Sequence, residues 1–264
     1  MISPELLSLA ENANTHGPLG PGHERIENER FVLWMGPRDH PAYNVAQRLR
    51  LTPGSVDATI EEVHALLRER GRFACTWEVG SSATPPDLVE RLRAHGLADD
   101  DDPDVAAMVL TAPPPPPPPG VEARPVRDVD EYIAAKHVAE AAFGMPPDPD
   151  RVEWWRTGFE EQQALGHGRT FVALLDGRIV AHGTSSYTEH GVTLNGGATT
   201  PEMRGRGAYR ALVSARWDDA VARGTPVLVT QAGAMSKPIL ERLGFVEVAR
   251  IWILVDHFTS APPA

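Results

Sequence analysis

Hydrophobic and polar positions follow two different periods along this chain, which predicts a protein built from both helices and strands. The segment DVDEYIAAKHVAEAAFG has the apolar spacing of a helix that begins near Asp128, and DPDRVEWWRTGFEEQQALG predicts a second helix. Two strands follow in FVALLDGRIVAHGTSSY. They meet at Asp176-Gly177, a dipeptide that favours a hairpin because it tolerates positive φ.

The C-terminal part of the chain continues this alternation. VTLNGGATT predicts a strand before Pro201, and apolar residues within 208–223 share one helical face, with Gly224 as the stop. PVLVTQA is a continuous apolar strand, SKPILERLG predicts a helix, and VEVARIWILV predicts a last strand pair. With a short strand in VEARPV, the predicted order after residue 120 is β-α-α-β-β-β-α-β-α-β.

The first half repeats the later part of this order. GSVDATIEEVHALLRERGRFACTWEVG predicts a helix, a glycine stop and a strand, as does RGAYRALVSARWDDAVARGTPVLVTQAG. Gly71 then corresponds to Gly224, and Gly96 corresponds to Gly244. An internal duplication explains these matches most economically, although generic alternation of helices and strands is a competing explanation. The glycine turn RGRGAYR has no counterpart, because RLTPGSVDAT stands in its place.

A run of seven prolines, residues 113–119, followed by Gly120, separates the two halves. Proline fixes φ and lacks an N–H, so this run predicts a polyproline II linker, a spacer of about 20 Å. A docking site for a proline-binding module is the alternative. We therefore expect a first domain over 1–112, a linker over 113–120 and a second domain over 121–264.

Composition narrows the class of protein. The 264 residues are 42% hydrophobic and 23% charged, which is ordinary for a globular protein of two domains. The formal net charge of −11 argues against a nucleic-acid binder, and cationic or amine partners fit better. The acidic run over 99–102 is interpreted as a solvated loop, with attraction of a cationic acceptor as the alternative.

Cys75 is the one cysteine in the sequence, so an intramolecular disulfide is impossible and a buried structural thiol is expected. No spacing of His, Asp or Glu suggests a metal site. The N-terminus lacks the pattern of a signal peptide, and no apolar run approaches the roughly 20 residues that span a bilayer. We expect a cytoplasmic protein without a membrane partner.

The turn RGRGAYR, residues 204–210, carries the clearest chemistry. A strand, a glycine-bearing turn and a helix place unpaired backbone N–H groups at a helix N-terminus, where the dipole favours an anion such as pyrophosphate. Gly205 and Gly207 allow close approach of the backbone, and Arg204, Arg206 and Arg210 offer charge-assisted hydrogen bonds. An exposed basic turn that begins a helix is the competing interpretation.

In its order of motifs this region resembles the GNAT family of N-acetyltransferases. The family signature, RxxGxG or RxxGxA after the fourth strand and often preceded by proline and an acidic residue, is matched by Pro201, Glu202, Arg204 and Gly207. The leucine, glycine and phenylalanine that often end a later helix of the family match LGF at 243–245. The resemblance covers 121–257 and implies two tandem GNAT-like α/β domains, each a mixed, mostly antiparallel sheet flanked by helices. The first copy would be degenerate and lack the turn.

The resemblance also implies an acetyl-CoA co-substrate and direct attack of a small-molecule amine on the thioester in a ternary complex. Backbone of the fourth strand would hold pantetheine, and the turn would hold pyrophosphate. The cofactor-binding set that we predict is Ala198, Thr199, Arg204, Gly205, Arg206, Gly207, Ala208, Tyr209 and Ser236. The first domain would shape the acceptor site or the interface of a homodimer.

Two positions depart from the family pattern. Tyr209 occupies the last motif position, usually glycine or alanine, so its side chain must point away from the phosphates. Leu240 stands where the family often has a tyrosine that acts as general acid. Ser236 is the candidate donor that we name instead, with an N-cap of the next helix as its competing role.

The general base is not identified by the sequence. Candidates are His182, Glu189 and His190 around the third and fourth strands, and Glu160 and Glu161 in the helix pair that usually forms the acceptor wall. Each is more often a surface or packing residue.

Two further observations leave function open. Trp154 and Trp155 could line an acceptor pocket, although one of two adjacent helical tryptophans usually faces the core. Because Leu240 replaces the acid, a non-catalytic protein that binds acyl-CoA or a partner is the alternative function. A different acyl donor or an O-linked acceptor is a third.

Overall fold

The computed structural model describes residues 2–259 and shows a mixed α/β fold with two compact units. The first unit comprises Met1–Met108, Gln231–Pro238 and Glu247–Ala264, and the second comprises Val109–Thr230 and Ile239–Val246. Two C-terminal segments therefore complete the first unit. The linker-based boundaries at 112 and 121 differ from these compact units, and they stay a prediction about the two copies of the duplication.

The first unit is a sheet flanked by helices, ordered β1-β2-β3-β4-β11-β5. Strands β1 to β3 are antiparallel, β3 and β4 are parallel, and β11 runs antiparallel to β4 with Leu254 opposite Trp77. The elements are α1 (Pro4–Glu11), α2 (Ala13–His16), β1 (Glu24–Glu27), β2 (Val32–Met35), η1 (Pro41–Tyr43), β3 (Asn44–Gln47), α3 (Val56–Arg68), β4 (Ala74–Gly80), α4 (Leu88–Ala94), β5 (Ala98–Leu110) and β11 (Val246–His257).

Apolar periodicity explains how α3 joins this core. Val56, Ile60, Val63 and Leu67 recur at helical spacing, and each is at most 1% exposed. They belong to one cluster with Trp77 of β4. Burial of such side chains removes about 1.5–3 kcal/mol each of unfavourable apolar hydration. The helix predicted from the sequence is therefore confirmed, with its apolar face on the sheet.

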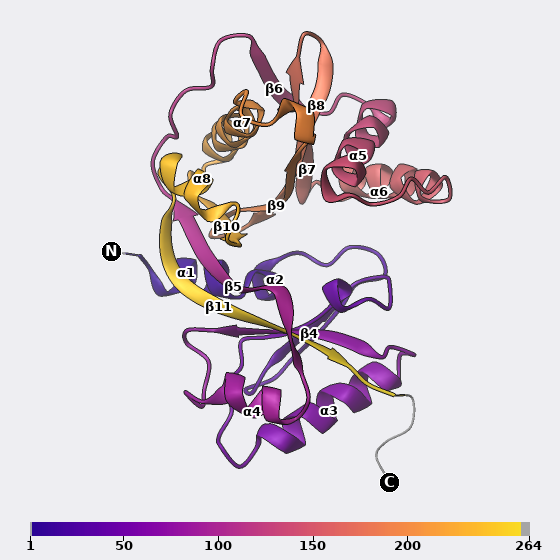
Figure 1. The fold of residues 1–264 in the computed structure, drawn as a ribbon, viewed down its shortest axis with the longest axis vertical. Helices are drawn as coiled ribbons and strands as arrows, with labels where there is room; N and C mark the ends of the chain where they lie inside the picture. Colours follow the sequence, from indigo (N-terminus) through magenta and orange to yellow (C-terminus); the bar gives the residue numbers. More distant parts are fainter. Residues whose placement is uncertain (1, 260–264) are drawn as a thin grey trace. The chain divides into compact units, whose positions relative to one another are not determined.

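The second unit has a sheet ordered β10-β9-β8-β7-β6. Its strands β6 to β9 are antiparallel, and β9 and β10 are parallel. Figure 1 shows α5 and α6 on one face of this sheet and α7 on the other. The elements are β6 (Val121–Pro125), α5 (Val129–Phe143), α6 (Arg151–Leu165), β7 (Gly168–Leu175), β8 (Arg178–Thr188), β9 (Gly191–Thr199), η2 (Pro201–Met203), α7 (Ala208–Ala222), β10 (Leu228–Ala232) and α8 (Lys237–Arg242).

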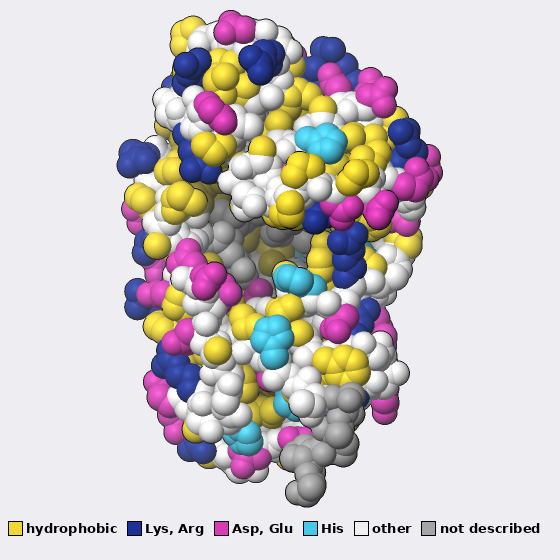
Figure 2. Space-filling model, turned by 45° about the vertical axis from the view of Figure 1, so that its right-hand side comes forward, with side chains coloured by type: hydrophobic (Ala, Val, Ile, Leu, Met, Phe, Trp, Pro, Cys, Tyr) yellow, Lys and Arg dark blue, Asp and Glu magenta, His cyan; other side chains and the backbone are white. Residues whose placement is uncertain are grey.

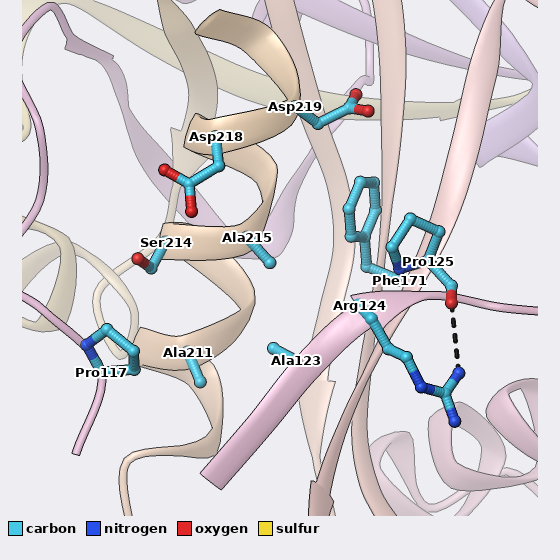
Figure 3. A pocket seen from close by; sticks show the side chains of 10 residues that line it. All are labelled: Pro117, Ala123, Arg124, Pro125, Phe171, Ala211, Ser214, Ala215, Asp218 and Asp219. Atoms are coloured by element: carbon cyan, nitrogen blue, oxygen red, sulfur yellow. Dashed lines mark hydrogen bonds between the residues drawn. The ribbon is translucent and has the colours of Figure 1, made fainter. Parts of the chain in front are cut away.

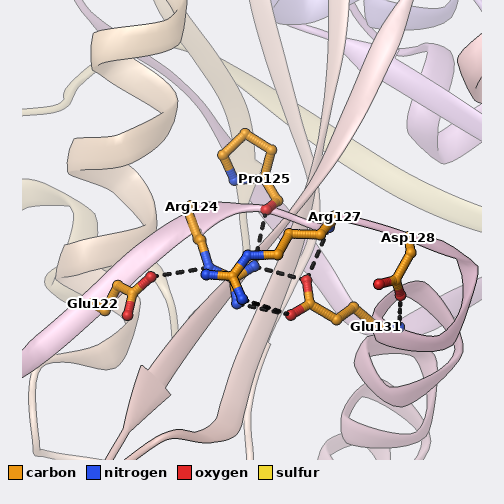
Figure 4. A network of polar contacts seen from close by, with 6 residues as sticks. All are labelled: Glu122, Arg124, Pro125, Arg127, Asp128 and Glu131. Carbon is orange, nitrogen blue, oxygen red and sulfur yellow. Dashed lines mark hydrogen bonds and ion pairs between the residues drawn. The ribbon is translucent and has the colours of Figure 1, made fainter.

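Helix α5 starts where the sequence predicts. The Asp128 side chain accepts a hydrogen bond from the Glu131 N–H at 2.9 Å, which satisfies an amide of the first turn. Glu131 in turn accepts two hydrogen bonds from Arg124 of β6, both at 2.7 Å, and one from the Arg127 amide (Figure 4). These hydrogen bonds hold the pKa of Glu131 below its ordinary value, with Arg124 as the largest cause. The network fixes the start of α5 to the end of β6.

The two units repeat one topology, as a duplication requires. In each, a parallel strand pair is joined by a helix: β3 and β4 by α3, and β9 and β10 by α7. The helix stops also correspond, because Gly71, Gly224, Gly96 and Gly244 all have positive φ, between +67° and +99°.

Two sequence-based expectations are wrong. VEVARIWILV forms one continuous strand, β11, instead of a strand pair, and this strand pairs with β4 from Ile251 onward. The acidic run over 99–102 lies in β5, not in a loop. Asp99 accepts hydrogen bonds from Arg93 and from the Trp252 indole, and Asp102 accepts one from the Ala234 N–H, so these carboxylates are anchored.

Candidate functional site

The glycine turn, residues 204–210, joins η2 to α7 at the end of β9. Gly205 has φ of +76° and Gly207 has φ of +86°, a left-handed conformation that favours glycine. Gly207 is the N-cap residue of α7, and no side chain caps this helix. The predicted sequence of strand, turn and helix is therefore confirmed, with an uncapped helix N-terminus at the turn.

The backbone amides of the glycine turn are free for a ligand. Within the described chain, the N–H groups of 205–209 donate to no other segment, and the first turn of α7 has no acidic side chain. The Arg204 amide differs, since it donates to the Pro201 carbonyl at 3.3 Å. Because a helix N-terminus carries partial positive charge, this group of amides has the chemistry of an anion site.

The arginines of the turn have different tasks. The Arg204 guanidinium donates to the Thr199 and Ala142 carbonyls, both at 3.3 Å, and so ties the turn to β9 and α5. The Arg206 side chain is exposed. Nε of Arg210 is buried and has no partner among the described residues. Arg206 thus presents an exposed guanidinium to an anion, and Nε of Arg210 is a buried donor without a described partner.

The polyproline linker packs on the glycine turn. A Cβ added to Gly207 would lie 2.3 Å from Cγ of Pro118, a distance that real Cβ atoms do not tolerate. By contrast, nothing lies within 4 Å of a Cβ added to Gly205. Gly207 is therefore required by the fold itself, because of both its positive φ and the proline above it.

Strand β9 has an exposed stretch next to the turn. Its parallel register with β10 covers Val192 and Thr193. Asn195, Gly196 and Gly197 beyond that register are exposed. An edge of this kind presents backbone N–H and C=O groups that an extended ligand can pair with.

The two predicted pantetheine residues follow the exposed stretch. Ala198 is 7% exposed and pairs with His182 of β8, and Thr199 is half-buried and pairs with Ala181. They lie between the exposed backbone and the glycine turn, so one segment brings the predicted strand and turn residues together.

Tyr209 turns its ring toward β9. A Cβ added to Gly197 would lie 2.8 Å from Cε2 of Tyr209 and 3.6 Å from its hydroxyl. The ring therefore occupies the space that a side chain at 197 would need, and the amide of Tyr209 stays in the turn. Sequence reasoning missed this pairing, although glycine within a strand is a known signal of close approach by another group.

Ser236 and Leu240 lie on or before α8. The Ser236 hydroxyl donates to the Gly233 carbonyl at 3.3 Å, and residue 236 belongs to the first unit. Leu240 is 1% exposed and packs as a core residue. The leucine at the position of the family acid is thus part of the hydrophobic core.

His182 is the buried member of the base candidates. It is 3% exposed, and neither ring nitrogen has a hydrogen-bond partner among the described residues. Burial lowers the pKa of His182 to about 3, and the charges of Lys136 and Arg216 act in the same direction. The imidazole is therefore neutral near pH 7, with its Cε1 atom 4.0 Å from a Cβ built on Gly196.

The remaining base candidates lie elsewhere in the second unit. Glu189 and His190 form the turn between β8 and β9, while Glu160 and Glu161 lie on α6. None of these four is buried.

The two tryptophans of α6 divide as expected for neighbouring helical residues. Trp155 is 5% exposed and its ring centroid is 5.0 Å from that of His137, whereas Trp154 is 39% exposed. One of the pair therefore packs, as the sequence suggests.

A groove of about 340 Å³ runs between α7 and β6 in the same unit. Figure 3 shows Phe171 between the two walls and Pro117 of the linker at one end. The Asp219 carboxylate in the groove accepts hydrogen bonds from Arg169, Tyr187 and Arg223. Asp219 is engaged by these donors and Arg124 by Glu131, while Ser214 and Asp218 place further polar side chains along the groove.

The first unit fills the corresponding strand ends with its own side chains. Glu11, at the end of α1, accepts hydrogen bonds from the Ser82 N–H at 2.7 Å and from the Ser82 hydroxyl. Asn12 accepts one from the Arg48 N–H at 2.8 Å, just after β3. Both side chains are at most 3% exposed. The ends of β3 and β4 are therefore bridged by the segment that joins α1 and α2.

Two buried titratable groups lie on β4. Cys75 is 0% exposed, which confirms a buried thiol, and burial raises its pKa well above the ordinary value. Glu78 is 9% exposed and accepts a hydrogen bond from Gln231 at 3.4 Å. Burial raises the pKa of Glu78 to about 7, a shift that this hydrogen bond opposes.

Surface charge and helix length add two observations. Lys and Arg side chains on the face in Figure 2 are interspersed with Asp and Glu. Over residues 2–259, no helix has the length and apolar character needed to cross a membrane.

Comparison with known families identifies the second half of the chain. Residues 122–248 match the family described as "Acetyltransferase (GNAT) domain". A search of curated proteins finds no match. Residues 122–248, which contain β9, the glycine turn and α7, thus form a domain of the GNAT acyltransferase family.

Solved structures share the fold of this chain over most of its length. A GNAT-type N-acetyltransferase from Kribbella flavida is 19% identical, with 89% of each chain covered and a TM-score of 0.67. A tandem GNAT protein from the clavulanic acid biosynthesis pathway is 17% identical, with 98% of this chain and 94% of that chain covered and a TM-score of 0.63. A GCN5-related N-acetyltransferase from Sphaerobacter thermophilus is 19% identical, with 90% of this chain and 82% of that chain covered and a TM-score of 0.62. At these identities the likeness establishes the fold, which is that of two GNAT-like halves.

Proposed function

We propose that this protein transfers the acetyl group of acetyl-CoA to the amine of a small molecule. The observation that carries the proposal is the group of unpaired amides at 205–209, which begins α7 beside the exposed stretch of β9. A CoA thioester has a pyrophosphate, which suits the helix N-terminus, and an extended pantetheine arm, which suits the exposed edge of the strand.

In this proposal the chain supplies binding and orientation. Amides of 205–209 hold the pyrophosphate, with charge from Arg206 and Arg210, and the backbone at Ala198 and Thr199 pairs with pantetheine. The amine attacks the thioester carbonyl directly in a ternary complex, so no acyl-enzyme forms. Cys75 takes no part, in keeping with its burial and raised pKa.

Calorimetry with acetyl-CoA tests the binding step. Arg206→Glu reverses an exposed charge in the turn that makes no hydrogen bond or ion pair with residues 2–259, and we expect about 10-fold weaker binding, near 1.4 kcal/mol. Arg178→Glu makes the same change at an exposed arginine on the first residue of β8 and is the matched control. Wild-type protein that binds neither acetyl-CoA nor CoA contradicts the proposal.

A second candidate function is a non-catalytic acyl-CoA-binding or partner-binding protein. It is favoured by Leu240, which is buried in the core where the family often has its acid. This candidate predicts CoA binding without turnover. Release of free thiol from acetyl-CoA in the presence of a broad amine panel eliminates it, whereas binding without release eliminates the transferase.

The acceptor and setting are part of the same proposal. The net charge of −11 supports a cationic acceptor, and a buried lone thiol supports a reducing compartment such as the cytoplasm. An O-linked acceptor or another acyl chain is tested with the same thiol assay by changing the acceptor panel and the donor. A homodimer is tested by sedimentation.

A further inference from the structure

Two glycines on neighbouring strands of the second unit are covered by side chains from α7. Tyr209 lies on Gly197 of β9, as described above. Nη1 of Arg216 would be 2.8 Å from a Cβ added to Gly183 of β8. Both side chains therefore rest directly on strand backbone, on the face of the sheet that α7 covers.

Arg216 is a buried cation without an anionic partner. It is 1% exposed, its Nε donates to the Leu212 carbonyl at 3.2 Å, and its Nη1 and Nη2 atoms have no hydrogen-bond partner in the described chain. No ion pair links it to a carboxylate among residues 2–259, although the protein has a net charge of −11. Burial lowers the pKa of Arg216, and Tyr209 opposes this shift, so the two side chains are electrostatic neighbours.

Such an arrangement is costly unless negative charge appears beside it. A buried charged group without a partner costs several kcal/mol, and an arginine remains protonated even so. Two fixed donors such as the Tyr209 hydroxyl and the Arg216 guanidinium are most effective, away from water, when the negative charge that they stabilise develops during a reaction. The arrangement therefore points to an anion formed on the α7 side of β9.

The proposed reaction forms an anion at that place. If the pantetheine arm follows the exposed stretch of β9, its sulfur end lies along Asn195, Gly196 and Gly197, and the Tyr209 ring covers Gly197. The departing group is a thiolate. Leu240, at the position where the family often has its proton donor, has no proton to give.

We propose that Tyr209 is the catalytic general acid for the leaving thiolate. Arg216 is the residue that positions the Tyr209 hydroxyl and stabilises the tyrosinate that forms. This inference rests on the proposed acetyl transfer. It assigns the proton donor to the residue that departs from the family motif in the glycine turn.

The amine lone pair forms a C–N bond with the thioester carbonyl carbon, and the tetrahedral adduct collapses with cleavage of the C–S bond. Sulfur leaves with that electron pair and takes the proton of the Tyr209 hydroxyl. The resulting tyrosinate is stabilised by Arg216 and regains a proton from solvent, which also receives the proton lost by the amine. The products are the acetamide and CoA thiol.

Steady-state kinetics with acetyl-CoA and an accepted amine test this role. Tyr209→Phe keeps the ring on Gly197 and removes the hydroxyl. We expect kcat to fall about 100-fold or more while the Kd for CoA stays within about threefold. The matched control is Tyr187→Phe, which removes a hydroxyl bound to Asp219 in the same unit and leaves kcat near wild type.

The pH profile separates proton donation from packing. Wild-type kcat is expected to decrease at alkaline pH as the donor loses its proton. This alkaline limb of the pH profile is expected to be absent in Tyr209→Phe. Arg216→Met removes the charge beside the hydroxyl and moves the limb to higher pH, a change that a purely structural role would not produce. Thermal unfolding and the Kd for CoA check that both variants are folded.

The outcomes distinguish this inference from the proposed function. Wild-type protein that releases no thiol with any amine overturns both. An active wild type with an equally active Tyr209→Phe variant overturns the assignment of the acid alone. The same is concluded if Tyr209→Phe and Tyr187→Phe lose activity equally, or if the alkaline limb survives in Tyr209→Phe.

Discussion

At the scale of single residues, Gly207 combines a proposed role in ligand binding with a conformational requirement of the fold. We expect Gly207→Ala to destabilise the protein by about 2–4 kcal/mol, because Cβ meets both a positive φ and Pro118. Gly205→Ala has the same φ problem but open space, so its cost is about 1 kcal/mol. Denaturant unfolding measures both.

A double-mutant cycle assigns the cause of this cost. Pro118→Ala removes the ring that a Cβ at 207 would strike, so it is expected to recover part of the loss in Gly207→Ala and to leave Gly205→Ala unchanged. Equal costs at 205 and 207, without recovery, would mean that Pro118 does not rest on the turn in solution.

The buried imidazole of His182 is expected to lower the free energy of unfolding at acidic pH. Its folded pKa of about 3 lies below the ordinary 6.5, so the unfolded chain binds the proton more readily below pH 6.5. The stability due to the neutral ring is complete above pH 6.5 and is lost as pH falls toward 3, at most about 2 kcal/mol by pH 5. Urea unfolding of His182→Leu between pH 5 and 7 is expected to show a shallower pH dependence than wild type, and an unchanged slope would contradict it.

Glu78 has the opposite effect on the pH dependence of stability, because its buried carboxyl lowers the free energy of unfolding as pH rises. Its pKa is raised from 4.5 to about 7, so the folded state holds the proton better between these values. Its contribution is complete below pH 4.5 and is lost as pH rises through 7, at most about 3 kcal/mol by pH 8. Glu78→Gln is therefore expected to be more stable than wild type at pH 8, with the difference in unfolding free energy shrinking toward pH 5. A constant difference would rule out burial of the charge as its cause.

At the scale of elements, the segment between α1 and α2 bridges the ends of β3 and β4 in the first unit. Glu11→Ala leaves both Ser82 donors without their acceptor, and we expect a loss of about 1–3 kcal/mol in unfolding free energy. Glu90→Ala removes an exposed carboxylate from α4 and is the control, with an expected effect within about 0.5 kcal/mol. Equal effects of the two variants would mean that Glu11 does not bridge the strand ends.

Elements with a local signal could be predicted from the sequence. Asp128 caps α5 through its own side chain, and Gly224 follows α7 in the left-handed conformation. Hydrophobic period, caps and glycine stops are properties of a few adjacent residues, so they survive without knowledge of the fold. The glycine turn belongs to this group, because its geometry follows from Gly205 and Gly207.

Features that join distant segments could not be predicted. The side chain of Tyr209 was expected to point away from the phosphates. Its contact with Gly197 could not be predicted, because it depends on the packing of α7 on β9. The burial of Arg216 without a carboxylate partner depends on the same packing. Glu11 contacts Ser82, which lies 71 residues away in the sequence. The acidic run over 99–102 was misjudged because its partners, among them Trp252, are remote in sequence. In each case the missing information is tertiary contact, which periodicity does not carry.

At the scale of the whole molecule, the two compact units are not two contiguous pieces of chain. Strand β11 belongs to the C-terminal half by sequence and pairs with β4 of the first unit from Ile251 to His257. Residues 231–238 also belong to that unit. The first 112 residues therefore lack a central strand of their own sheet, and β4 would expose an unpaired edge.

We accordingly expect a protein of residues 1–112 to show no cooperative unfolding transition, whereas the full chain unfolds cooperatively. A synthetic peptide of residues 244–259 supplies β11, and its addition is expected to restore β structure by circular dichroism in a saturable manner. A peptide with Leu254→Lys, which places a charge where the core has a fully buried leucine, is the control and is expected to fail. Cooperative unfolding of 1–112 alone would show that the first copy retains an independent fold, and that β11 adds to a sheet already complete.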